Sequence, residues 1–178
     1  MYKRQILIQL ARQLTQLRVV ATASRAETRA WCLELGAHLV IDHSKPLAAE
    51  LKAAGIAEVD MVASLTQTEQ HYAQIIESLK PQGQLAVIDD MKTLDAMPLK
   101  TKSLSLHWEM MFARSRFETP DIAEQGALLA EVAALVDAGR VRTTANASFG
   151  TINAANLRRA HALIESGKAQ GKVVLAGF

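Results

Sequence analysis

Polar side chains that could hold a ligand follow several short apolar runs of this sequence. Ser24 and Arg25 come directly after "RVVATA", and a hydroxyl beside a guanidinium suits a phosphate group. His43 follows "HLVID", Ser64 closes "VDMVAS" and Asp89 closes "GQLAVID". If these runs are parallel strands, all five residues lie at carboxyl ends of strands, where open α/β sheets bind their ligands. We therefore expect a ligand site built from strand ends.

Each of these residues also has an explanation that needs no ligand. Arg25 would be a solvated side chain in a turn between a strand and a helix, and His43 would be an exposed histidine of a turn. Ser64 and Asp89 are individually weak signals. The residue types alone leave both explanations open.

A metal site is not expected from the sequence. The five histidines stand at positions 38, 43, 71, 107 and 161, and Cys32 is the single cysteine. Metal-binding patterns such as Cys-x-x-Cys and His-Glu-x-x-His do not occur, nor does the Gly-x-Ser-x-Gly pattern of a nucleophile elbow. Cys32 falls on the apolar face of an expected helix and is interpreted as a core residue.

The composition is that of a globular domain. The 178 residues are 49% apolar, and the formal net charge is only +2, with no block of like charges. These features argue against a disordered chain and give no sign of nucleic-acid binding. The sequence contains no apolar segment long enough to predict a membrane span. A lone cysteine cannot form an internal disulfide, which fits a cytoplasmic location.

The spacing of apolar residues predicts helices that alternate with short strands. Apolar residues recur every three or four positions over residues 6–17, which predicts a helix, although "QILIQL" could instead be a strand. "KPQG" is expected to separate a helix from the strand after it. The expected strands are 17–23, 38–42, 59–65, 83–89, 103–112, one near 147–152, and 171–178; the further helices are 26–37, 46–54, 68–79, 121–139 and 154–167.

This alternation predicts an α/β fold, a doubly wound parallel sheet of the Rossmann type. In that sheet the strand order is 3-2-1-4-5-6, so the first strand lies between the second and the fourth. The sequence before the first helix holds neither that strand nor a glycine-rich loop, and the first glycine is Gly36. Strand two would then pair with strand four, "QILIQL" would act as a strand, or another chain would fill the gap.

Four stretches together resemble the coenzyme-binding half of the medium-chain dehydrogenase/reductase superfamily. They are "IQLARQL", "ATASRAETRAWCLELGAHLVIDHSK", "SLKPQGQLAVID" and "AANLRRAHALIESGKAQGKVVL". The sequence is most similar to zinc-type alcohol dehydrogenase and quinone oxidoreductase relatives. The resemblance implies an NAD(P)-binding domain over residues 1–145. It also implies a C-terminal helix and strand over residues 146–178, which in the family belong to the catalytic domain.

The resemblance further implies what this chain lacks. Family members begin with a catalytic domain, followed by a strand and a loop of the A/G-x-x-G-x-x-G type that lets the pyrophosphate reach a helix N-terminus. That loop would lie just before Ile6, where "YKRQ" stands. We therefore expect an N-terminally truncated oxidoreductase with no catalytic residues, no zinc, and little or no turnover on its own.

The cofactor implied by the resemblance is NADP(H). An acidic residue after the second strand would bind the 2′-hydroxyl of NAD, whereas Ser24 and Arg25 suit the 2′-phosphate of NADP. His43 stands where relatives place a ring against the adenine. Phe112 and Arg114 could approach the nicotinamide, although such residues are more often packing and surface residues.

The predicted partner is a second copy of the chain. The segment "SLSLHWEMMF" (103–112) would form an apolar sheet edge, and in the resembled family this strand pairs with its copy. The alternative is that the helix 121–139 covers it.

A second interpretation of the function is a non-enzymatic remnant that dimerises and binds no cofactor. An S-adenosylmethionine methyltransferase would need a glycine-rich first loop and an acidic residue after strand two, and the sequence has neither.

Overall fold

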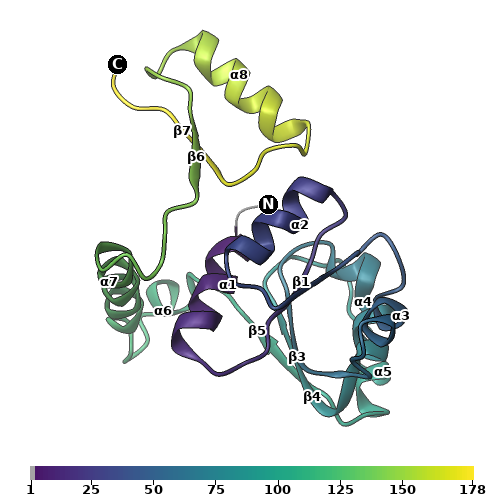
Figure 1. Cartoon of the computed structure of the whole chain (residues 1–178). Helices are drawn as coiled ribbons and strands as arrows, with labels where there is room; N and C mark the ends of the chain where they lie inside the picture. The colour runs from purple at the N-terminus through teal and green to yellow at the C-terminus, as the bar shows by residue number, and fades with distance from the viewer. Residues whose placement is uncertain (1–2) are drawn as a thin grey trace. The chain divides into compact units, whose positions relative to one another are not determined.

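The computed structural model describes residues 3–178, whose helices and strands alternate as the sequence predicts (Figure 1). Within these residues the strands form three sheets, β1-β2, β3-β4-β5 and β6-β7, and the pairing in the last two is parallel. The elements are α1 (Lys3–Leu14), β1 (Val20–Thr22), α2 (Ala26–Glu34), β2 (Leu39–Ile41), α3 (Leu47–Ala53), β3 (Val59–Ser64), α4 (Thr68–Ser78), β4 (Leu79–Val87), α5 (Met97–Lys100), β5 (Ser105–Trp108), α6 (Ala113–Arg116), α7 (Glu124–Asp137), β6 (Ala145–Ser148), α8 (Ala154–Glu165) and β7 (Lys172–Val174). The predicted Rossmann-like α/β class is confirmed.

The chain divides into two compact units that interleave in the sequence. Unit 1 takes the residues up to Ala21, Arg25–Val40 and Ala127–Phe178, and unit 2 takes Thr22–Ser24 and Ile41–Gly126. The predicted boundary between residues 145 and 146 concerns the family's domain division and stays a prediction. No helix within residues 3–178 is long and apolar enough to cross a membrane.

Unit 2 is built on the sheet β3-β4-β5, with α3, α4 and α5 gathered beside it (Figure 1). Its core is an apolar cluster contributed by α4, β4 and α5: Ile75, Ile76, Leu79, Leu85, Val87 and Leu99. Leu85 and Val87 lie on one face of the middle strand and have no exposed surface. Burying a side chain of this size contributes roughly 1.5–3 kcal/mol to folding, so these β4 residues stabilise the unit substantially.

The "KPQG" segment does not separate α4 from the next strand, and this expectation was wrong. β4 already begins at Leu79, which is fully buried and pairs with Val59. An irregular register and the left-handed backbone of Gln82 (φ 64°) mark a β-bulge here. The Lys102 ammonium donates to the Glu77 carbonyl at the end of α4 (2.9 Å). The strand begins at Leu79 because burial of this side chain in the sheet outweighs the turn preference of the residues that follow it.

β5 is shorter than the strand predicted over 103–112. Its ladder with β4 runs only from Ser105 to Trp108, because β4 itself ends at Val87, whose carbonyl accepts the Glu109 N–H (2.9 Å). The apolar residues after the ladder lie outside regular elements, before and after the short α6, and they are more than half exposed: Met110, Met111, Phe112 and Phe117. The apolar edge exists, but only four of its residues belong to a strand.

The first segment of unit 1 is the helix α1, so the helical alternative is confirmed. Ile8 and Gln9 are buried on its inner face. The Gln9 amide pairs with the backbone of Arg142: its Nε2 donates to the Arg142 carbonyl (3.2 Å), and the Arg142 N–H donates to its Oε1 (2.9 Å). This pair of hydrogen bonds fixes α1 to the segment that follows α7.

Two of the three ways of filling the predicted gap are not used. "QILIQL" is helical, and within residues 3–178 β1 pairs with β2 alone while β3 pairs with β4 alone. Of the stretch "YKRQ", where a glycine-rich loop would lie, residues 3–5 are already part of α1, and residues 1–2 lie outside the described residues. That another chain fills the gap stays a prediction.

Gly171 lies at a close approach of the backbone in unit 1. It has φ +75°, and a Cβ at this position would lie 2.3 Å from the Thr144 carbonyl oxygen and 3.1 Å from Trp31. Directly after it, the Lys172 N–H donates to the same Thr144 carbonyl (2.6 Å). Only glycine satisfies both the backbone angle and the space.

We expect Gly171→Ala to destabilise the chain more than Gly167→Ala. Both glycines have a left-handed backbone, so both substitutions cost about 1–2 kcal/mol of backbone strain. No atom lies within 4 Å of a Cβ built at Gly167, whereas the overlap at Gly171 adds about 1–3 kcal/mol. Urea unfolding followed by circular dichroism measures both losses. Equal losses would contradict the close approach.

Candidate functional site

The carboxyl ends of β3, β4 and β5 are aligned at one end of the sheet in unit 2. Ser64 pairs with Val87, and Val87 pairs with Trp108. Two of the predicted site residues follow from this register, because Asp89 comes two residues after Val87 and Phe112 comes four residues after Trp108. This is the end at which parallel sheets bind ligands.

Ser64 and Asp89 meet through Thr68, the first residue of α4. The Ser64 and Thr68 hydroxyls are 2.6 Å apart, and the Thr68 hydroxyl donates to Asp89. The Thr68 backbone N–H also donates to Asp89 Oδ2 (2.9 Å). Asp89 therefore caps α4, where the helix end favours a negative charge. In this structure both oxygens of the Asp89 carboxylate accept hydrogen bonds from Thr68.

Sequence reasoning missed Thr68, although a threonine at the start of a predicted helix is a recognisable signal. The residue before it, Gln67, is in the left-handed conformation (φ 55°) and makes no side-chain cap. The helix is capped instead by a carboxylate 21 residues further along the chain. Only the strand register shows that Asp89 reaches this helix end.

His43 meets His71 from the first turns of α4, with ring centroids 6.3 Å apart in an edge-on arrangement. Thr68 and His71 are three residues apart and share one side of the helix. The first turn of α4 therefore contacts His43 through His71, and it contacts Ser64 and Asp89 through Thr68. His71 Nδ1 is buried and makes no hydrogen bond with any residue in the described part of the chain. His71, like Thr68, was not found from the sequence.

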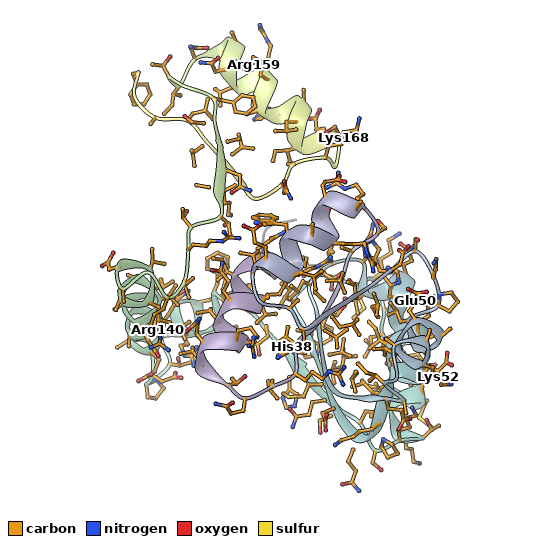
Figure 2. The ribbon with its side chains drawn as sticks, in the orientation of Figure 1. His38, Glu50, Lys52, Arg140, Arg159 and Lys168 are labelled. Atoms are coloured by element: carbon orange, nitrogen blue, oxygen red, sulfur yellow. The ribbon has the colours of Figure 1, made fainter. Side chains whose placement is uncertain are left out.

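The turn after β2 is held by hydrogen bonds around Asp42. The Asp42 N–H donates to Glu50 Oε2 (3.2 Å; Glu50 is labelled in Figure 2), and Asp42 Oδ1 accepts from the Ser44 hydroxyl (2.7 Å) and N–H (2.9 Å). The hydrogen bond from the Ser44 hydroxyl, with that from its N–H, holds the pKa of Asp42 below its usual value. These contacts fix the loop that carries His43.

Ser24 and Arg25 follow β1, as predicted, but belong to different units. In unit 2, the Ala23 N–H donates to the Ile41 carbonyl (2.9 Å), which places Ser24 just beyond the paired ends of β1 and β2. In unit 1, Arg25 stands before α2, and its Nε lies 3.2 Å from Thr28 Oγ1 and 3.2 Å from Glu27 Oε1.

Phe112 and Arg114 are surface residues in this structure. Phe112 is 57% exposed. Arg114 donates to Asp121 (2.8 Å), and this hydrogen bond raises the pKa of the guanidinium further. Within residues 3–178 no group of three or more His, Cys, Asp or Glu side chains could hold a metal ion.

We expect Asp89→Asn to lower the free energy of unfolding by about 1–2 kcal/mol, since it removes the charge that caps α4. Asp90→Asn is the matched control, because Asp90 is exposed and carries the same charge one residue later. Urea unfolding at neutral pH measures both. A loss at Asp90→Asn equal to that at Asp89→Asn would show that general charge, and not the cap, matters.

Known proteins similar to this chain are zinc-type dehydrogenases. A family model described as zinc-binding dehydrogenase matches residues 35–175. A zinc-type alcohol dehydrogenase-like protein of Staphylococcus aureus (strain MSSA476) is 34% identical over 160 residues, which are 89% of this chain and 48% of that protein. The chain thus spans about half the length of the curated relatives it matches.

Solved structures give the same result. A proposed zinc-dependent alcohol dehydrogenase from Rhizobium etli CFN 42 is 54% identical, with a TM-score of 0.91 over 98% of this chain and 51% of that one. A mycobacterial protein determined in complex with NADPH is 25% identical, with a TM-score of 0.77 over 96% of this chain and 52% of that one. The chain therefore belongs to the zinc-binding dehydrogenase family of the medium-chain dehydrogenase/reductase superfamily and represents the coenzyme-binding domain of such an oxidoreductase.

Proposed function

We propose that this domain binds NADP(H) in preference to NAD(H). The observation that carries the proposal is the turn Ser24–Arg25 after β1, which offers a hydroxyl and a guanidinium that is partly exposed (37% of the side chain). Its contacts with Thr28 and Glu27 both use Nε, so the terminal nitrogens are free of those contacts. A 2′-phosphate bound there would gain charge-assisted hydrogen bonds. The NADPH complex of the mycobacterial relative supports the same choice.

The other residues of the site have supporting roles in this proposal. His43 would lie against the adenine, and the buried Nδ1 of the neighbouring His71 is a polar atom that a ligand could satisfy. Ser64 and Asp89 act through the cap of α4 and position its first turn. Phe112 would be near the nicotinamide end. The described residues offer no group of three or more His, Cys, Asp or Glu side chains that could hold zinc.

The same proposal includes little or no turnover by this chain alone. The cofactor supplies hydride transfer when bound, and the rate of that step depends on a substrate held against it in the right geometry. The chain spans about half the length of its relatives. At the carboxyl ends of the strands, Asp89 accepts hydrogen bonds from Thr68, which gives it a structural role and not that of an acid or base. A cytoplasmic location also belongs to this proposal, supported by Cys32, which is the single cysteine and is fully buried.

Calorimetry with NADPH and NADH tests the role of Arg25. Arg25→Ala should weaken NADPH binding roughly tenfold or more and leave NADH binding nearly unchanged, because a charge-assisted contact is worth about 1.5–3 kcal/mol. Glu27→Gln should strengthen NADPH binding, since it removes a negative charge 3.2 Å from Arg25 Nε that would repel the 2′-phosphate. Arg158→Ala, on the exposed side of α8, is the matched control.

Two results would contradict this proposal. Equal affinity for the two cofactors would remove Arg25 from the site. Robust NADPH-dependent reduction of quinones, enones or simple ketones by the purified chain would overturn the proposed lack of turnover.

A second candidate function, a dimerising module that binds no cofactor, is favoured by the edge of the unit 2 sheet. β5 is the last strand of the sheet in the described part of the chain, and Trp108 on it is 57% exposed. Open strand edges with apolar side chains commonly pair with another chain. We propose that a second copy of this chain occupies the edge.

Light scattering tests this dimer. Trp108→Lys should shift the chain toward monomer by at least tenfold in dissociation constant, because a charge would be buried at the contact. Phe117→Lys is the control, since Phe117 is 71% exposed and lies outside the strand. Leu106 is unsuitable because it packs against the core cluster. A monomer at roughly tens of micromolar wild-type chain would refute the dimer.

A further inference from the structure

A pocket of about 360 Å³ in unit 1 is lined by three arginines and one carboxylate. It lies where the ends of α1, α2 and α7 come together, and its charged side chains are Arg12, Arg140, Arg142 and Glu34. Figure 2 labels Arg140 at the end of α7. Three positive charges face one negative charge, so the pocket has a clear excess of positive charge.

The two arginines after α7 are held in place by α1. Val141 between them has no exposed surface, whereas Arg140 and Arg142 are exposed. Gln9 pairs with the Arg142 backbone, and the Gln13 side-chain and backbone oxygens accept from Arg140 Nε (3.3 Å) and Nη2 (3.4 Å). Because Gln9 and Gln13 are one helical turn apart, both arginines are presented on the same side of α1.

The third arginine, Arg12, comes from that same side of α1. Its stem packs on Gly36: a Cβ there would lie 3.0 Å from Arg12 Cγ, and the φ of Gly36 is +106°. Among the residues the structure describes, the Arg12 guanidinium forms no hydrogen bond or ion pair. Glu34 pairs with Arg142 (2.8 Å). One carboxylate is therefore available for three guanidinium groups.

The arginines satisfy the helix ends only in part, through the bond from Arg140 to the Gln13 carbonyl in the last turn of α1. A helix carboxyl end carries a partial negative charge, which nearby arginines offset. However, the N–H groups of Gly36, Ala37 and Arg140 already bond the last carbonyls of α2 and α7 at 2.9–3.0 Å. The guanidinium N–H groups of Arg12, and those of Arg140 and Arg142 that are not bonded to Gln13 or Glu34, remain available to a ligand in the pocket.

We propose that this pocket binds a phosphate-type dianion, either inorganic phosphate or the phosphate group of a small monoester. The planar fork of a guanidinium matches phosphate oxygens, and two negative charges would balance the excess positive charge. This site is separate from the proposed contact of Arg25 with a 2′-phosphate. Arg25 precedes α2 and Glu34 ends it, so the two lie at opposite ends of a helix of 9 residues, about 13 Å long.

Titration of the ¹⁵N-labelled chain with inorganic phosphate at constant ionic strength tests the proposal. The amide signals of Gly36 and Gly139, which line the pocket, should shift with phosphate. Arg12→Ala combined with Arg140→Ala should weaken binding at least tenfold, and Arg12→Lys should weaken it less. Arg25→Ala and Arg158→Ala should leave these shifts unchanged.

Three outcomes would overturn the site. The first is the absence of shifts at Gly36 and Gly139 in the wild-type chain, which needs no variant to fold. The second is equal weakening by Arg158→Ala, which would show nonspecific attraction to positive charge. The third is binding of the dicarboxylate malonate as tightly as phosphate, which would exclude a phosphate-specific pocket. Loss of cofactor preference in Arg25→Ala would concern the other site and leave this one standing.

Discussion

The middle position of β4 in a parallel sheet is the constraint on which the rest of unit 2 depends. Its residues Leu79, Leu85 and Val87 have no exposed surface, and no other strand of the sheet is buried to this degree in the described residues. Parallel pairing on both sides places the ends of β3 and β5 level with Val87. Two residues later Asp89 reaches α4 and caps it. The strand that makes the core therefore also places the site.

Because Asp89 caps α4, it restricts how a ligand can bind at the carboxyl ends of these strands. Its carboxylate already accepts two hydrogen bonds from Thr68, so a ligand that took over Asp89 would leave the end of α4 uncapped. An anion at this helix end would also meet a negative charge. The geometry at this end of the sheet therefore favours contacts through neutral groups. It assigns Asp89 a structural role that the strand-end pattern alone could not distinguish from a binding role.

The fold could be predicted from the sequence where a local signal and burial agree. The helices around Trp31 and Ile75, and the strands that end at Ser64 and Val87, all lie within a few residues of their predicted positions. "KPQG" was misread because Pro and Gly predict a turn, whereas burial of Leu79 draws the segment into the sheet. The length of β5 was overestimated because a strand needs a neighbour, and β4 ends first. Both errors come from pairing, which the spacing of residues along one chain does not encode.

The candidate site was predictable only in part for a similar reason. Ser24, His43, Ser64 and Asp89 became candidates because each lies at or just after the end of a strand, whereas Thr68 and His71 lie inside a helix and become visible only when α4 is placed on the sheet. The arginine pocket has no local signal at all, because Arg12 and Arg140 are brought together from distant parts of the chain.

The two cationic sites of unit 1 share α2 as a rigid spacer. Arg25 stands before its first residue, and Glu34 closes it at the arginine pocket. At physiological ionic strength, charges in solvent are screened over about 8 Å, which is less than the roughly 13 Å length of the helix. Two anions bound at its ends would therefore repel each other only weakly. Occupation of the pocket should leave cofactor affinity almost unchanged, unless the phosphate alters the conformation of α2 itself. Since coupling through a helix needs two discrete arrangements of that helix, and α2 is tied by Arg29 to the β2 carbonyl of Val40 (2.8 Å), the structure favours two independent sites.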